Sequence, residues 1–254
     1  IVYPGATVFQ GETDIELGGP LSGGVVKSAG DDEGVPLEVP NVPEDQPVGR
    51  YTTDGASGSP GVTVTTPRVT TLEVENVRGV DIAGGSVRQG SATSGSGELT
   101  VVGAWNYEEA ENLEVTVQDN DGLDVTGDAI VEPAGSTGDR TTKQAADITD
   151  NEVRWDTDLS DLDTGTFTVT LAGTDDLDFG TARRSATITV TSSDDVRLAF
   201  DRRTVTRGED ATFRIRGSSA GEYHIVTVAE SEFRSASLST AQRERIFRRV
   251  GDTV

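Results

Sequence analysis

The sequence predicts an all-β protein, and three observations lead to that prediction. Apolar residues alternate with polar ones in short runs, such as "TFTVTLA" from Thr166 and "SATITVT" from Ser185. Each run has about the length of a half-buried strand. Gly, Asp and Ser separate the runs at short intervals, with no sign of the helices that βαβ units require. This pattern is typical of tandem immunoglobulin-like β-sandwiches.

The alternation also predicts which residues face the core, because successive side chains of a strand point to opposite faces of its sheet. Threonine and other polar residues fill the opposite faces. The expected core positions are Leu99, Val101, Trp105, Tyr107, Leu113, Val115, Val117, Phe167, Val169, Leu171, Ala186, Ile188 and Val190.

Two short signatures each occur three times. The first, V-x-[QR]-G, begins at Val8, Val87 and Val205. The second places a small or apolar residue, Gly and any residue before an aromatic, which is Tyr51, Phe167 or Tyr223. The glycine lets the chain turn, and the aromatic seats the next strand, as the corner tyrosine does in immunoglobulin-like sandwiches. Three repeats predict three modules.

Pro- and Gly-rich "GASGSPGVTVTTPR" and polar "TSSDDV" mark the expected boundaries. They divide the chain into an N-terminal β module (1–66), an immunoglobulin-like sandwich (67–193) and a further sandwich module (194–254). The third module is short, so we expect it to be incomplete and the parent chain to be longer. Its end carries one predicted short helix, in which Ser239 and Gln242 form a capping box and Gly251 is the stop.

The charge of the chain limits its partners. Asp and Glu number 44 against 21 Lys and Arg, which gives a net charge of −23, and Lys27 and Lys143 are the only lysines. Such a surface repels nucleic acid and anionic membranes. An acid-rich, lysine-poor chain is typical of proteins that work in concentrated salt, where screening weakens self-repulsion. The chain has no cysteine, and no apolar run long enough to span a bilayer.

Motifs for catalysis are missing from the sequence. The single histidine, His224, lies in the strand-like "GEYHIVTV", and a hydrolase triad needs a base beside a nucleophile. No phosphate loop, zinc-ligand spacing or dinucleotide fingerprint occurs, and no asparagine stands in an N-x-[ST] sequon. We therefore expect no enzyme activity and no asparagine-linked sugar on these residues.

Acidic clusters are the remaining candidate sites. Several carboxylates in one loop suit calcium, which takes six to eight oxygen ligands. "DNDG" begins like an EF-hand loop, but Ile130 stands where the bidentate Glu belongs. The alternative is that the aspartates form turns and keep the surface solvated. The candidate calcium ligands are Asp119, Asp121, Asp124, Asp156, Asp158, Asp161, Asp163, Asp175, Asp176 and Asp178.

Five stretches, in order along the chain, resemble the amino-terminal part of the haloarchaeal major cell-surface, or S-layer, glycoproteins. They are "ATVFQGE", "EGVPLEVPNVPEDQPVGRYT", "NYEEAENLEVTVQDNDGLDVTGD", "DLDTGTFTVTLAGTDDLDFGTA" and "STAQRERIFRRVGDT". The resemblance implies tandem immunoglobulin-like domains in a secreted, commonly glycosylated and cation-dependent protein. It also implies self-association into a two-dimensional lattice on the cell surface. Further domains, a stalk and an anchor are expected in the parent chain, so membrane contact is expected only through that anchor.

The sequence thus favours a structural cell-envelope protein whose acidic loops bind calcium at or beside its contacts. Two alternatives stay open: a surface adhesin or other binding ectodomain made of the same modules, and a noncatalytic module of a secreted enzyme.

Overall fold

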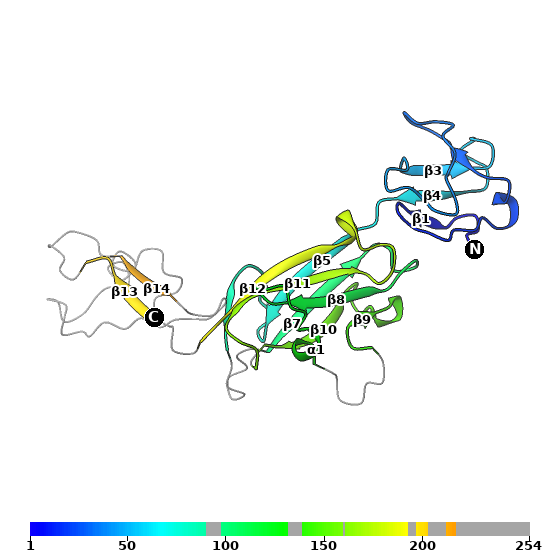
Figure 1. Cartoon of the computed structure of the whole chain (residues 1–254). Coiled ribbons are helices and arrows are strands. Elements are labelled where there is room, and N and C mark those ends of the chain that lie inside the picture. The colour runs from blue at the N-terminus through cyan, green and yellow to red at the C-terminus, as the bar shows by residue number, and fades with distance from the viewer. Residues whose placement is uncertain (90–97, 132–138, 160, 193–196, 203–211, 217–254) are drawn as a thin grey trace. The chain divides into compact units, whose positions relative to one another are not determined.

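The computed structural model describes residues 1–89, 98–131, 139–159, 161–192, 197–202 and 212–216 (Figure 1). Strands dominate these residues, and the helical elements among them are short, which confirms the predicted all-β class. None of the described helices has the length and apolar character needed to cross a membrane.

A four-stranded sheet forms from the first part of the chain. Its order is β1 (Thr7–Phe9), β4 (Gly61–Thr65), β3 (Gly49–Thr52), β2 (Val26–Lys27), and β1 runs parallel to β4. The 3-10 helix η1 (Gly19–Leu21) lies between β1 and β2. One side of this sheet and its loops bury a small core of Val8, Ile15, Leu21, Val25, Leu37, Val42, Tyr51, Val62 and Val64.

The residues after this sheet form a β-sandwich (Figure 1). One sheet has the order β10 (Val153–Asp158), β7 (Glu98–Trp105), β5 (Val69–Asn76). The other has the order β6 (Ser86–Arg88), β12 (Arg184–Thr191), β11 (Gly165–Gly173), β8 (Leu113–Gln118), β9 (Thr142–Lys143). The connections include α1 (Thr126–Ala129), η2 (Ala145–Asp147) and η3 (Gly180–Ala182).

This arrangement matches the immunoglobulin pattern of an A-B-E sheet facing a C-F-G sheet. The match takes β5, β7 and β10 as A, B and E, and β8, β11 and β12 as C, F and G. Strand D has no counterpart among the described strands, while β9 extends the second sheet beside β8. Side chains of both sheets form one core. All the predicted core positions lie in it except Ala186, which is partly buried against it.

The two recurring signatures make the same kind of contact in each of the first two modules. Val8 and Val87 lie in short strands, β1 and β6, each of which pairs in parallel with a neighbour. The glutamine two residues later donates to a loop carbonyl: Gln10 Nε2 lies 2.7 Å from Gln46 O, and Gln89 Nε2 lies 2.6 Å from Leu162 O.

Gln46 and Leu162 each stand five residues before the corner aromatic, Tyr51 or Phe167. Each signature therefore ties an edge strand to the corner of its own module. The third copy, at Val205 and Tyr223, lies outside the described residues.

Tyr51 makes the predicted corner contact. Its ring is fully buried, and its hydroxyl donates to Pro47 O, four residues upstream, at 2.6 Å. Gln46 Nε2 donates to the same hydroxyl at 2.8 Å and also to Pro36 O at 3.1 Å. The corner thus ties three segments of the module together through buried polar groups, which are costly to leave without partners.

The strands β13 (Arg197–Phe200) and β14 (Phe213–Arg216) pair antiparallel as a separate two-stranded sheet. The predicted helix at 239–251 and His224 lie outside the described residues. The boundaries at 66 and 193 stay predictions.

We predict that Tyr51→Phe lowers the free energy of unfolding by about 1–2 kcal/mol, because Pro47 O and a Gln46 N–H lose a buried hydrogen-bond partner. Denaturant unfolding followed by tyrosine and tryptophan fluorescence measures the change. The exposed Tyr3 is the matched control, and Tyr3→Phe should stay within about 0.5 kcal/mol of the parent chain. Equal effects at the two positions would contradict the assignment of a corner to Tyr51.

Candidate cation site

Three carboxylates meet at one end of the sandwich. Glu111 lies two residues before β8, and Asp175 and Asp176 lie just after β11. These strands pair antiparallel with Leu113 opposite Gly173, so the start of β8 and the end of β11 reach the same sheet end. One carboxylate oxygen from each residue lies within 4.8 Å of the other two. No other group of three potential metal ligands this close occurs in the described part of the chain.

Gly173 allows the loop to close over Glu111. A Cβ at this position would lie 2.0 Å from Glu111 Oε2 and 2.4 Å from Leu177 O. The Gly173 amide donates to Leu177 O at 2.9 Å, which closes residues 173–177 into a tight turn. Any side chain at residue 173 would therefore push this turn and the Glu111 carboxylate apart.

The backbone of Glu111 is held on both sides. Its amide donates to Tyr107 O at 2.9 Å, and its carbonyl accepts the indole N–H of Trp105 at 3.0 Å. Because Trp105 and Tyr107 are core residues, the position of Glu111 is fixed by the sandwich itself. The site is therefore built on packed strand ends.

The carboxyl group of Glu111 is unusually placed. The residue is only 9% exposed. Oε2 accepts a hydrogen bond from the Leu177 amide at 3.2 Å, whereas Oε1 is buried and accepts no well-aligned hydrogen bond from the described residues. Burial, reinforced by the nearby charge of Asp176, raises the pKa of Glu111 to about 7, although the amides of residues 175–177 partly offset the increase. The groups around Glu111 thus offset only part of the cost of burying its negative charge.

Neighbouring groups add more negative charge. Asp175 is exposed and Asp176 half-buried. Asp176 Oδ2 accepts the amide of Thr13, and the pKa of Glu12 is raised by burial and by Asp176. Tyr107 packs edge-on against Phe9, and its hydroxyl donates a hydrogen bond to Ala182 O at 2.8 Å. Burial and the nearby charge of Glu111 raise the pKa of Tyr107. Carboxylate oxygens gathered in this way are the ligands that hard cations prefer.

The other predicted ligands are not gathered into such a group. Asp119 Oδ1 accepts the amides of Asp121 and Leu123, both at 2.9 Å. Asp124 Oδ1 accepts the amide and the hydroxyl of Thr126, which lower the pKa of Asp124. These are the contacts of the turn-forming alternative. Calcium binding by these residues stays a prediction.

The remaining predicted ligands are dispersed. Asp156 and Asp158 lie on β10, opposite Thr100 and Glu98 of β7. Asp161 and Asp163 lie in the turn before β11 and are exposed, as is Asp178. Of the ten predicted residues, the structure brings only Asp175 and Asp176 together with a third carboxylate.

Glu111 was not among the predicted ligands, although the sequence carries a signal for it. The buried face of β8 reads Leu113, Val115, Val117, and Glu111 continues the same alternation by one step. A carboxylate is unusual at a position whose side chain the strand alternation directs toward the core, because burying a charged group without a partner is costly.

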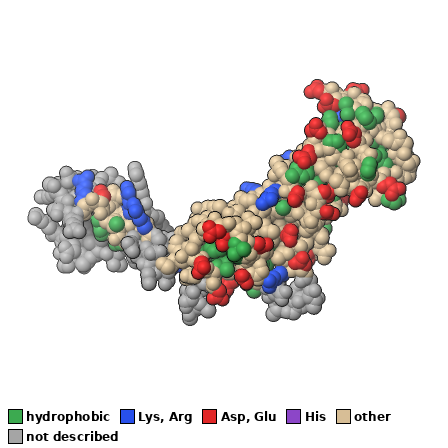
Figure 2. Space-filling model, in the orientation of Figure 1, with side chains coloured by type: hydrophobic (Ala, Val, Ile, Leu, Met, Phe, Trp, Pro, Cys, Tyr) green, Lys and Arg blue, Asp and Glu red, His purple; other side chains and the backbone are tan. Residues whose placement is uncertain are grey.

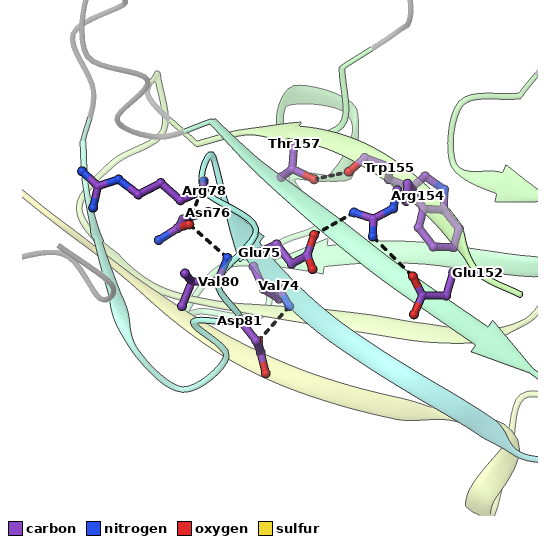
Figure 3. A network of polar contacts seen from close by, with 10 residues as sticks. All are labelled: Val74, Glu75, Asn76, Arg78, Val80, Asp81, Glu152, Arg154, Trp155 and Thr157. Carbon is purple, nitrogen blue, oxygen red and sulfur yellow. Dashed lines mark hydrogen bonds and ion pairs between the residues drawn. The ribbon is translucent and has the colours of Figure 1, made fainter. Parts of the chain in front are cut away.

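A second polar network lies on the outer face of the three-stranded sheet (Figure 3). Arg154 of β10 reaches Glu75 of β5 at 2.7 Å and Glu152 at 3.3 Å. Asp81 accepts the amide of Val74 and thereby holds the turn that follows β5. The Arg154 side chain is 53% exposed and the Glu75 side chain 15%, so concentrated salt screens the Arg154–Glu75 pair only in part. This network is a structural feature of the surface.

Comparison with known proteins shows which curated proteins the sequence is similar to. No family model matches the chain. The chain is 43% identical over 260 residues to the cell surface glycoprotein of Haloarcula marismortui, 40% over 278 residues to that of Haloarcula japonica, and 38% over 264 residues to that of Halobacterium salinarum. These alignments cover 99–100% of this chain but only 29–30% of each relative.

We predict that Gly173→Ala lowers the free energy of unfolding by at least about 2 kcal/mol, because the new methyl group collides with Glu111 Oε2 and Leu177 O. Gly58 is the matched control: a Cβ there meets nothing within 4 Å, so Gly58→Ala should change stability by no more than about 0.5 kcal/mol. Thermal unfolding followed by circular dichroism measures both variants. A Gly173→Ala chain as stable as Gly58→Ala would contradict the tight closure of the loop.

Proposed function

We propose that the chain is a structural component of an S-layer lattice. Over nearly its whole length it is homologous to part of the haloarchaeal cell surface glycoproteins, and this homology indicates a location at the cell surface. In this proposal copies of the chain associate with one another, and divalent cations assist the contacts. The proposal gives the chain no catalytic role, and its acidic surface disfavours nucleic acid as a partner. The observation that carries the proposal is the homology to proteins named cell surface glycoprotein.

The fold and the charge support this role. The β-sandwich and the four-stranded sheet before it are small, packed units, and the surfaces of such units can repeat across a sheet of molecules. The face in view in Figure 2 carries many acidic side chains and few basic ones. With a net charge of −23, two copies repel each other at low salt. A divalent ion between facing carboxylates replaces that repulsion with attraction, whereas monovalent salt only screens it.

We predict that the purified chain assembles when millimolar calcium is added at low monovalent salt, and that a chelator reverses the assembly. Sedimentation velocity and electron micrographs of the same samples measure particle size and order. Potassium chloride at equal ionic strength is the control, because it changes the screening without bridging carboxylates. Equal assembly in both salts would contradict cation assistance. A chain that remains monomeric in both would contradict the lattice role and favour an adhesin.

A further inference from the structure

We propose that Glu111, Asp175 and Asp176 form a calcium site inside one molecule, which fastens the loop after β11 to the start of β8. This inference goes beyond the proposed lattice role, because the ion acts within the chain and not between copies. The site would be occupied in the monomer and in the assembled protein alike.

The distances suit one calcium ion. Calcium binds its oxygen ligands at about 2.3–2.6 Å, so oxygens on opposite sides of the ion are about 5 Å apart. The three carboxylate oxygens all lie within 4.8 Å of one another, which places them within one coordination sphere. Magnesium holds its ligands at about 2.0–2.1 Å in strict octahedral geometry and gives up water reluctantly. A partly exposed group of three carboxylates therefore suits calcium, which accepts irregular ligand geometry, better than magnesium.

The buried oxygen of Glu111 points to a ligand independently of the cluster. The side chain is nine-tenths buried, and Oε1 accepts no well-aligned hydrogen bond from the described residues. Buried polar atoms nearly always have a partner, and a buried carboxylate oxygen without one is costly. An ion bound by both oxygens of the Glu111 carboxylate and by the two aspartates would supply that partner.

The charge balance also calls for a cation. Within the described ranges, no lysine or arginine forms an ion pair with Glu111, Asp175 or Asp176. Elsewhere the loop aspartates use amide and hydroxyl groups: Asp119 accepts two amides, and Asp124 accepts the two donors of Thr126. In the Glu111 cluster, the Leu177 amide donates to Glu111 Oε2 and the Thr13 amide to Asp176, but Glu111 Oε1 is buried without a well-aligned donor among the described residues. This buried oxygen separates the cluster from the ordinary acidic turns of the chain.

Binding at this site would stabilise the fold. Glu111 and the two aspartates come from segments more than 60 residues apart, and they come together only in the folded sandwich. An ion that binds the folded chain alone shifts the unfolding equilibrium by mass action. At a free calcium concentration 100 times the Kd, the unfolding equilibrium constant should fall about 100-fold.

The test uses the whole chain as a monomer at high potassium chloride, with calcium as the probe. We expect one calcium per chain by isothermal titration calorimetry, and a higher unfolding temperature with calcium than with chelator. Glu111→Gln should abolish both the binding and the calcium-dependent shift. In chelator this variant should unfold at the same temperature as the parent chain or a higher one, because the isosteric amide removes a buried charge while its oxygen can still accept the Leu177 amide.

Glu44→Gln is the control, since Glu44 is an exposed carboxylate outside every candidate calcium site and this variant should keep the calcium response. Terbium provides a readout of position. It takes the same ligands as calcium, and Trp105 beside Glu111 should sensitise its emission in the parent chain and in Glu44→Gln, but not in Glu111→Gln. Loss of calcium binding in Glu44→Gln, or its persistence in Glu111→Gln, would overturn the proposal. A monomer without a calcium response would do the same, whatever its assembly behaviour.

Discussion

The antiparallel pairing of β8 with β11 is the constraint on which the rest of the site depends. Its register sets Val115 opposite Leu171 and Val117 opposite Val169, and all four side chains enter the core. The same register sets Leu113 opposite Gly173 and so brings Glu111 and the following aspartates to one sheet end. A slip of one residue would turn every side chain to the opposite face and remove both the core and the cluster.

Much of the fold could be predicted because its signals are local. The runs around Phe167 and Ile188 show period-two alternation within a single strand, and Tyr51 stands at a corner marked by a glycine two residues earlier. The cluster could not be predicted in the same way. It depends on which strand pairs with β8, and that information lies in long-range packing. The aspartate-rich turn at Asp119 was the more conspicuous candidate, yet its carboxylates accept hydrogen bonds from their own turn.

The carboxylates of this chain fall into two physical classes. Exposed ones, such as Asp161 and Asp163, are close to solvent ions, and concentrated salt weakens both their repulsions and their attractions. Glu111 is largely withdrawn from solvent, so screening reaches it poorly, and burial raises its pKa to about 7. Concentrated salt therefore weakens the repulsion among the surface charges that make up the net charge of −23, but it does not screen the buried charge of Glu111 at the start of β8.

The scaffold around Glu111 is arranged to keep a carboxylate in an unfavourable place. An apolar residue would continue the buried face of β8 at lower cost, yet Trp105 and Tyr107 fix the backbone of Glu111, and Gly173 leaves room for its oxygen. Departures from the rule that buried charges are paired are expected where a protein binds something. Since Glu111 is too buried to reach another molecule, an ion held there would affect neighbouring copies of the chain only indirectly. A bound ion would order the loop that presents the exposed Asp175 and Asp178, and would so connect the interior of the sandwich to its acidic surface.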